Sequence, residues 1–233
     1  MAKDAAKWVS RGCEVIYAKI GRGEELDLEI ATQVRKAIGS KRLRLDANEA
    51  WDTLTAQRMI RALAPLDIEF IEQPTTSRSI AALSQVRRGS AIAIAADQVA
   101  FTPEDVYEIC RMQAADVIVL GVHETGGITK LCKAAAIAEA AGLNICLHGL
   151  YETGITACAH NQVGATLMNL DDANQYMNHF LAEDIVAKPD LALSAGRLPV
   201  FGGPGLGFQL DWDAVSRAEE AFRVRSQQAH SAP

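Results

Sequence analysis

Six positions in this chain of 233 residues follow short apolar runs at nearly regular intervals. They are Lys19, Asp46, Glu72, Asp97, Gly121 and His148, and successive positions are 24 to 27 residues apart. Five of the six carry side chains that can bind a cation or move a proton. One structural unit therefore recurs about every 26 residues, and a functional group stands at the same point of almost every unit.

The three acids at consecutive positions, Asp46, Glu72 and Asp97, suggest a metal site. Carboxylates gathered in one place repel one another and have raised pKa values unless a cation lies between them. Hard oxygen ligands in this number suit Mg²⁺ best and Mn²⁺ next. The alternative is that each acid is simply a solvated strand end, but the near-constant period favours the metal site.

Lys19 and His148 stand at the two ends of the series and are candidates for proton transfer. A lysine that is partly desolvated near a bound cation can have its pKa pulled toward neutrality and act as a general base. The histidine can serve as a second acid or base on the other face of a substrate. The alternatives are a snorkelling surface lysine and a structural histidine.

Short strands and longer helices must position these residues. The apolar runs predict strands at 13–20, 42–45, 68–71, 92–96, 117–120 and 143–147. Helical spacing of apolar residues predicts helices at 27–38, 53–63, 79–88, 102–111 and 128–141. Thr102 followed by Pro103 and Glu104 is a typical helix start.

Alternation of strands and helices indicates a parallel sheet, either a closed barrel or an open doubly wound sheet. In a barrel all strand C-termini converge on one face, so the six positions would meet in one site. In an open sheet most of them would lie too far apart to cooperate. The regular placement favours the barrel, although 233 residues is slightly below the usual length of about 250.

The last third of the chain is less regular. It predicts a helix at 152–167, a weak strand at 174–177, and loops that end in the glycine cluster at 202–207. That cluster is interpreted as a tight turn, with a phosphate cradle as the alternative. A final helix is predicted at 211–224, so that one domain occupies residues 1–225 and a disordered tail occupies 226–233.

Composition excludes several classes of protein. A formal net charge of −6 with scattered basic residues offers no stripe for nucleic acid. The longest apolar stretches, 91–96 and 117–122, are far too short to span a membrane, and no leader opens the chain, so a cytoplasmic location is expected. The five cysteines are odd in number and form no C-x-x-C pair, which favours reduced core residues.

Several ordered motifs resemble the enolase superfamily, in its mandelate racemase/muconate lactonizing enzyme branch, over about residues 1–213. The motifs are Tyr17-Ala18-Lys19, Asp46-Ala47-Asn48, Ile71-Glu72-Gln73-Pro74, Asp97-Gln98, Gly126-Gly127-Ile128-Thr129 and Pro204-Gly205-Leu206-Gly207. The resemblance implies an α/β fold, a TIM-like (β/α)₇β barrel. It also implies removal of the α-proton of a small carboxylate substrate to give a metal-stabilised enediolate, leading to dehydration, isomerisation or racemisation.

The resemblance also implies roles for individual residues. Asp46, Glu72 and Asp97 take the places of the Mg²⁺ ligands, Lys19 that of the usual base, and His148 that of the strand-seven histidine. The positions expected near the substrate are Tyr17, Asn48, Gln98 and Glu152.

Two departures weaken the expected chemistry. Tyr17 replaces a lysine that normally lowers the pKa of the base, and Gly121 stands where the family has an Asp or a Lys at the end of strand six. His148 thus lacks its usual orienting partner, unless His123 or Glu124 compensates. We therefore expect one-base elimination slightly more than two-base racemisation, with a catalytically silent metal-binding barrel or scaffold as the alternative function.

The start of the chain resembles the helix that leads into the second barrel strand. The α+β capping domain and the first strand of the family are therefore expected to be missing, which would leave at most seven of eight strands. Apolar surface exposed on that flank would favour a homo-oligomer.

Overall fold

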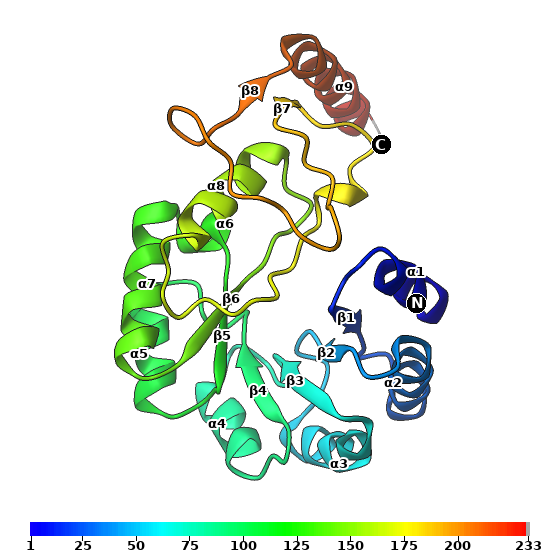
Figure 1. Ribbon diagram of the computed structural model, residues 1–233. Helices are drawn as coiled ribbons and strands as arrows, with labels where there is room; N and C mark the ends of the chain where they lie inside the picture. Colours follow the sequence, from blue (N-terminus) through cyan, green and yellow to red (C-terminus); the bar gives the residue numbers. More distant parts are fainter. Residues whose placement is uncertain (232–233) are drawn as a thin grey trace.

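Six parallel strands form one curled sheet in the computed structural model, which describes residues 1–231. The strands are β1 (Val15–Lys19), β2 (Arg42–Asp46), β3 (Ile68–Glu72), β4 (Ala93–Ala96), β5 (Val117–Leu120) and β6 (Asn144–Leu147). Their order in the sheet is their order in the sequence, without the reversal that defines a doubly wound sheet. The sheet curls into part of a barrel with helices on its outside (Figure 1), which confirms the barrel prediction.

The helices alternate with the strands. They are α1 (Ala2–Ser10), α2 (Glu24–Ile38), α3 (Thr53–Leu63), α4 (Ile80–Arg88), α5 (Pro103–Arg111), α6 (Val122–Thr125), α7 (Ile128–Ala140) and α8 (Gly154–Gly164), with a 3₁₀ turn, η1 (Ala64–Leu66), after α3. The expected start of α5 is confirmed: Thr102 and Asp105 form a reciprocal capping box. The single-turn helix α6 was not predicted.

The strands present two different faces because successive side chains point to opposite sides. One face packs against the helices and forms the main apolar core, with Leu43, Ile71 and Ile118 fully buried. The other face lines the inside of the curled sheet. There Phe70, Ala95, Val119 and Cys146 form a separate buried cluster, against which Tyr17 packs.

This inner cluster explains where the candidate residues point. Glu72, Asp97, Gly121 and His148 each lie two residues beyond a member of the cluster, and Lys19 lies two residues beyond Tyr17. A spacing of two keeps a residue on the same face of a strand. The candidate side chains therefore form the next layer of the interior, at the C-terminal end of the strands.

The weak strand predicted at 174–177 is wrong. An irregular segment, residues 169–175, follows β6 instead and exchanges only isolated bonds with it, such as Asp171 N–H to Ile145 O (2.8 Å) and Gln175 N–H to Leu147 O (2.9 Å). Asp, Asn and Ala in this segment have low strand propensity. Its side chains and carbonyls instead contact Arg42 and Arg44 of β2.

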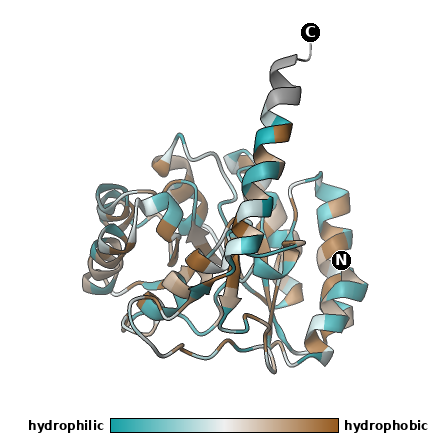
Figure 2. Cartoon of the chain, turned by 90° about the horizontal axis from the view of Figure 1, so that it is seen from above, coloured by the Kyte–Doolittle hydropathy of each residue, from teal (hydrophilic) through white to brown (hydrophobic). Residues whose placement is uncertain are grey.

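The C-terminal part contains the 3₁₀ turn η2 (Asn178–Phe180), an antiparallel pair of β7 (Val186–Lys188) and β8 (Gln209–Leu210), and the helix α9 (Trp212–Ser231). Figure 2 shows α9 projecting from the body of the fold. The helix predicted at 211–224 is observed from Trp212 and continues to Ser231. The division into a domain at 1–225 and a disordered tail at 226–233 stays a prediction. No proline or glycine interrupts 225–231, so the helix continues; residues 232–233 lie outside the described residues.

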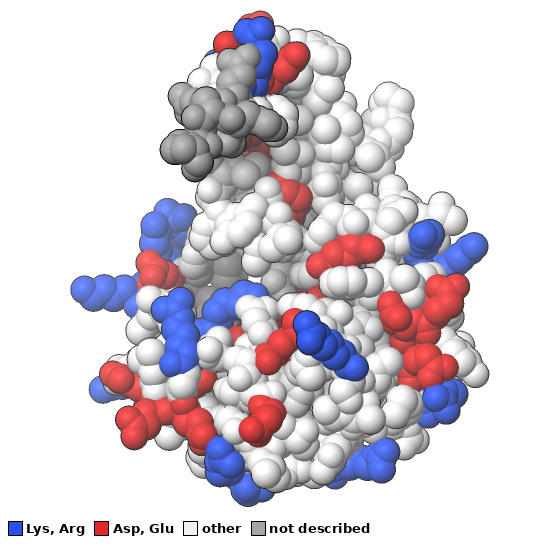
Figure 3. Space-filling model, turned by 180° about the vertical axis from the view of Figure 1, so that it is seen from behind, with Lys and Arg blue, Asp and Glu red and all other residues white. Residues whose placement is uncertain are grey.

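The surface seen in Figure 3 carries acidic and basic side chains interspersed. All five cysteines are free. Among the described residues, no helix has the length and apolar character needed to cross a membrane.

Candidate metal centre and flanking proton-transfer groups

The six sequence positions converge at the C-terminal end of the sheet. Lys19, Asp46 and Glu72 are the last residues of β1, β2 and β3 and are paired in register. Asp97, Gly121 and His148 directly follow β4, β5 and β6. The parallel arrangement thus brings together residues that are up to 129 positions apart in the sequence.

The three carboxylates form a compact, buried cluster. Asp46, Glu72 and Asp97 expose 0%, 1% and 3% of their surface, and one oxygen from each lies within 4.8 Å of the others. Burial removes the water that would otherwise separate these charges. Such a group requires either bound protons or a cation.

The raised pKa values of Glu72 and Asp97 show that their charged forms are disfavoured in this cluster. Burial, followed by the charges of Asp46 and Asp97, raises the pKa of Glu72 well above its ordinary value. Burial also raises the pKa of Asp97, while the nearby His148 acts against the rise. The Oδ1 atom of Asp97 is buried without a hydrogen-bond donor. An oxygen-rich site with an unpartnered carboxylate oxygen fits a hard divalent cation.

Two neutral donors contact Glu72. The hydroxyl of Tyr17 donates to Glu72 Oε2, and the amide of Gln175 donates to the same oxygen at 3.2 Å. Burial and the Glu72 charge raise the pKa of Tyr17 well above its ordinary value, so this phenol stays protonated. Tyr17 thus lies in the centre as a hydrogen-bond donor. Gln175 was not predicted, because it lies in the irregular segment.

Asp46 is contacted from two sides. The Lys19 ammonium pairs with Asp46 Oδ2. The backbone N–H of Asn48 donates to Asp46 Oδ1 at 2.8 Å, and its side-chain amide donates to Oδ2 at 3.2 Å. Lys19 and Asn48 are both exposed on the solvent side of the carboxylate, where a substrate can approach.

The pKa of Lys19 is raised, although we expected it to be lowered toward neutrality. Partial burial lowers it, but the charge of Asp46 and the hydrogen bond to it raise it by more. The expected lowering depended on a cation beside the ammonium, and here the carboxylate is the nearest charge.

His148 has a partner at the opposite end of the cluster. Its Nε2 lies 2.5 Å from Glu124 Oε2 and 3.5 Å from Asp97 Oδ1. Burial lowers the pKa of His148, but these two carboxylates raise it by more. Glu124, on α6, is therefore the carboxylate partner of His148, since Gly121 at the end of β5 has no side chain that could contact the ring.

Gly121 gives the space for this arrangement. A Cβ atom at position 121 would lie 2.5 Å from His123 Cε1 and 3.1 Å from His148 Nε2. The ring of His123 therefore occupies the volume that a larger side chain at the end of β5 would need. Gly121, in place of the Asp or Lys expected there, thus leaves room for the His123 ring.

His160, on α8, holds the start of α6 in place, because its Nε2 accepts a hydrogen bond from the backbone N–H of Val122 at 2.9 Å. Burial, followed by the nearby His148 and His123, lowers the pKa of His160 to about 4. The folded state therefore keeps His160 neutral at pH values at which the unfolded chain binds a proton.

This shift predicts a pH-dependent stability. As the pH falls from 6.5 to 4, His160 should remove up to about 3 kcal/mol from the free energy of unfolding, because the unfolded state takes up the proton first. The pH dependence should become flatter in His160→Gln, whose amide oxygen can still accept the Val122 N–H. Urea unfolding at several pH values measures both slopes, and equal slopes would contradict the prediction.

Gln98 and Glu152 are the other two residues that we expected near the substrate. Each has a buried oxygen without a hydrogen-bond donor, Oε1 and Oε2 respectively. The Glu152 carboxylate packs so closely on Gly149 that a Cβ there would lie 1.8 Å from its Oε1. No recorded hydrogen bond within the described residues joins either side chain to the three-acid cluster, so their substrate role stays a prediction.

The glycine cluster at 202–207 forms a tight turn, closed by the Gly207 N–H to Pro204 O bond of 3.2 Å. A two-residue strand, β8, follows it rather than a helix. It therefore lacks the helix N-terminus that a phosphate cradle requires.

Fold and site together define an α/β barrel protein with a buried three-carboxylate centre, beside which lie a lysine and a histidine. Residues 1–214 match the family described as enolase C-terminal domain-like. The chain belongs to the enolase superfamily, in its mandelate racemase/muconate lactonizing enzyme branch.

Curated relatives agree with this family. Muconate cycloisomerase 1-1 of Acinetobacter lwoffii is 33% identical over 206 residues, covering 87% of this chain and 54% of the relative. The L-Ala-D/L-Glu epimerase of Bacillus subtilis is 32% identical over 213 residues, covering 89% and 57%. The chain thus spans little more than half the length of these relatives, which are isomerases.

Solved structures give the same picture. The dipeptide epimerase from Cytophaga hutchinsonii, complexed with Mg and the dipeptide D-Ala-L-Val, superposes with a TM-score of 0.88 at 28% identity. The match covers 92% of this chain and 59% of the epimerase.

Proposed function

We propose that this chain contributes the catalytic centre of a Mg²⁺-dependent enzyme that removes the α-proton of a small carboxylate substrate. The observation that carries the proposal is the position of two proton-transfer groups around one buried carboxylate cluster. Lys19 contacts the cluster at Asp46, and His148 approaches it at Asp97, on strands at opposite ends of the six-stranded sheet.

Asp46, Glu72 and Asp97 are the residues that would hold the cation, with Mn²⁺ as a second choice. When bound there, the cation would supply positive charge that stabilises the negative charge developing on the substrate as the α-proton leaves. Tyr17 and Gln175 keep Glu72 in place through their hydrogen bonds.

Lys19 is proposed as the base that takes the α-proton at Nζ. Its pairing with Asp46 holds the ammonium beside the cluster, and its exposed position leaves it accessible. A cation held by the three carboxylates would lower the pKa of Lys19 and so supply the neutral amine that can take a proton. On the other side, His148 is proposed to deliver or accept a proton at Nε2. Glu124 holds the ring through this same nitrogen, so the contact between Glu124 Oε2 and His148 Nε2 would have to open when His148 exchanges a proton with a substrate.

We expected one-base elimination because His148 lacked a carboxylate partner in the sequence. The contact with Glu124 removes that reason. Groups on both sides of the centre favour two-sided proton transfer, as in racemisation or epimerisation. The named epimerases among the relatives support the same choice. The homo-oligomer stays a prediction.

Exchange of the substrate α-proton with deuterium tests the proposal directly. The protein is incubated in deuterated water with Mg²⁺ and a panel of hydroxy acids, amino acids and dipeptides, and the α-proton signal is followed by NMR. Loss of that signal for at least one carboxylate is expected. No exchange with any member of the panel would instead support a catalytically silent metal-binding barrel.

Metal binding is predicted to stabilise the fold. At a Mg²⁺ concentration 100 times the dissociation constant, the free energy of unfolding should rise by about 2.7 kcal/mol. Glu72→Gln keeps the shape of the side chain but removes its charge, so the Mg²⁺ effect should largely disappear. Thermal unfolding with and without Mg²⁺ checks this, with Glu104→Gln, on the first turn of α5, as the matched control. An unchanged Mg²⁺ effect in Glu72→Gln would place the cation elsewhere.

A further inference from the structure

A second group of potential metal ligands lies beside the three-acid cluster. His123, Glu124 and His148 each place one ligand atom within 4.8 Å of the others. The Glu124 carboxylate lies between the two imidazoles: its Oε2 is 2.5 Å from His148 Nε2, and its Oε1 is 3.5 Å from His123 Nε2.

The backbone around this group allows the close approach of the two rings. The ring centroids of His123 and His148 are 5.5 Å apart. A Cβ at position 121 would lie 2.9 Å from His123 Nδ1 and 3.1 Å from His148 Nε2, so a larger residue there would displace the rings from these positions. Position 121, directly after β5, thus carries no side chain, and the imidazoles of His123 and His148 and the Glu124 carboxylate lie close to it.

Two further contacts define the surroundings of this group. Asp97 Oδ1, which is buried and has no hydrogen-bond donor, lies 3.5 Å from His148 Nε2. His160 holds the first residue of α6 through the Val122 N–H, and its ring lies 6.4 Å from that of His123. α6, which carries two of the three ligands, is thus fixed to α8.

We propose that His123, Glu124 and His148 form a second metal site, for Zn²⁺ or a similar transition-metal ion. Two imidazole nitrogens and one carboxylate oxygen are a ligand set typical of a zinc site with an open fourth position. In a tetrahedral site, bonds of about 2.0 to 2.2 Å place the ligand atoms about 3.3 to 3.6 Å apart. Glu124 Oε2 and His148 Nε2, which are 2.5 Å apart, would therefore separate by about 1 Å as the ion replaces the proton between them, and the partly exposed His123 ring would rotate toward the ion.

The two metal sites differ in chemistry. The three-acid cluster offers oxygen atoms only, which suit Mg²⁺, whereas imidazole favours transition metals. His148 cannot bind Zn²⁺ through Nε2 and exchange a proton there at the same time. Occupation of the second site therefore removes the proposed acid/base group on that side of the centre.

The site itself does not depend on the proposed reaction, so its test measures metal binding alone. Tag-free protein saturated with Mg²⁺ is titrated with Zn²⁺ by calorimetry, and the product with one equivalent is studied by X-ray absorption spectroscopy. One equivalent of Zn²⁺ is expected to bind with two imidazole nitrogens among its ligands. His123→Ala should weaken this binding at least about tenfold, since even loss of a residue that only supports a ligand costs about 10- to 100-fold.

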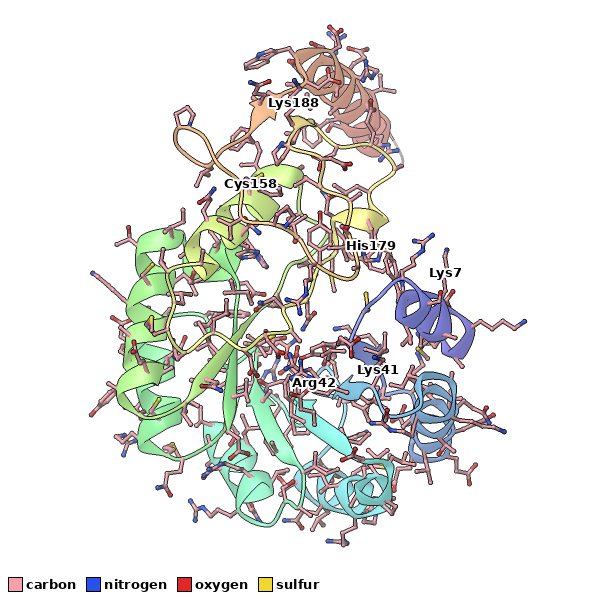
Figure 4. The ribbon with its side chains drawn as sticks, in the orientation of Figure 1. Lys7, Lys41, Arg42, Cys158, His179 and Lys188 are labelled. Carbon is pink, nitrogen blue, oxygen red and sulfur yellow. The ribbon has the colours of Figure 1, made fainter. Side chains whose placement is uncertain are left out.

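Two variants serve as controls. His179 lies beside α1 (Figure 4), where its ring contacts Trp8 with centroids 4.7 Å apart, so His179→Ala should leave Zn²⁺ binding unchanged. Asp46→Asn should weaken Mg²⁺ binding but keep the Zn²⁺ site. A Zn²⁺ spectrum with oxygen ligands only, or equal Zn²⁺ affinity in His123→Ala and the unchanged protein, would overturn the proposal. Absence of α-proton exchange would not affect it.

Discussion

Replacing Lys19 by alanine is expected to reduce α-proton exchange by about 10²- to 10⁴-fold, the usual contribution of a general acid or base. The ammonium contacts Asp46, and the Lys19 side chain is 48% exposed, so a substrate can reach it. Within the proposed mechanism Lys19 is the base on the β1 side of the centre, so its loss should slow the chemical step far more than binding. The rate constant and the substrate dependence of exchange separate these effects.

The stereochemistry of the remaining exchange makes this prediction sharper. If Lys19 and His148 serve opposite faces, Lys19→Ala should suppress exchange from one enantiomer of a substrate, and His148→Asn from the other. Suppression of both enantiomers by Lys19→Ala, with none lost in His148→Asn, would favour a one-base reaction.

Lys41→Ala is the matched control for Lys19. Its ammonium is paired with Glu14 at the N-terminal end of the sheet, so it carries a comparable ion pair away from the centre. Exchange should be unaffected. Unchanged exchange in Lys19→Ala would show that Lys19 is not the base.

The positions of the site residues could be predicted because barrel geometry depends on periodicity. Each apolar run in the sequence ends where a strand ends, and parallel strands bring their ends to one face. Lys19, Asp46, Glu72, Asp97 and His148 could therefore be grouped from spacing alone, and the structure brings them together.

The contacts that the sequence left open or missed lie where periodicity gives no signal. Glu124 was named only as one of two possible partners of His148, and Gln175 was not predicted. Glu124 lies on a helix of four residues, which is too short to show a helical pattern. Its contact with His148 depends on the space at Gly121, which only the folded backbone reveals. Gln175 reaches Glu72 from a segment that lacks regular structure.

The seventh strand was predicted wrongly for a related reason. The chain at 169–175 follows β6 but is held by contacts to arginines on β2, far away in sequence. Local propensity cannot anticipate such contacts. They also make β2 important for stability.

Arg44 is the central residue of these contacts. It is completely buried on the inner face of the sheet, and its guanidinium lies 4.6 Å from the centre of the Phe70 ring. It donates to Glu69 at 2.8 Å and 3.1 Å and to Asp171 at 3.3 Å, and it also donates to the carbonyl of Ala173. One buried cation thus joins β2, β3 and the irregular segment.

Arg44→Met is therefore expected to lower the free energy of unfolding by about 3 kcal/mol, near the lower limit for breaking a buried ion pair. The lower limit applies because Glu69 and Asp171 keep 26% and 22% of their side chains exposed, so water partly solvates the carboxylates that remain. Methionine keeps most of the apolar volume, so the loss reports mainly the charge and its hydrogen bonds. Urea unfolding at neutral pH measures the change.

Arg42→Met is the matched control, because Arg42 lies two residues earlier on the same strand and contacts Glu69 and Asp172. Its side chain, labelled in Figure 4, is 37% exposed. Exposed ion pairs contribute at most about 1 kcal/mol, so this variant should change stability little. Equal losses in the two variants would mean that charge near the N-terminal end of β2, rather than the buried position of Arg44, holds residues 169–175 against the sheet.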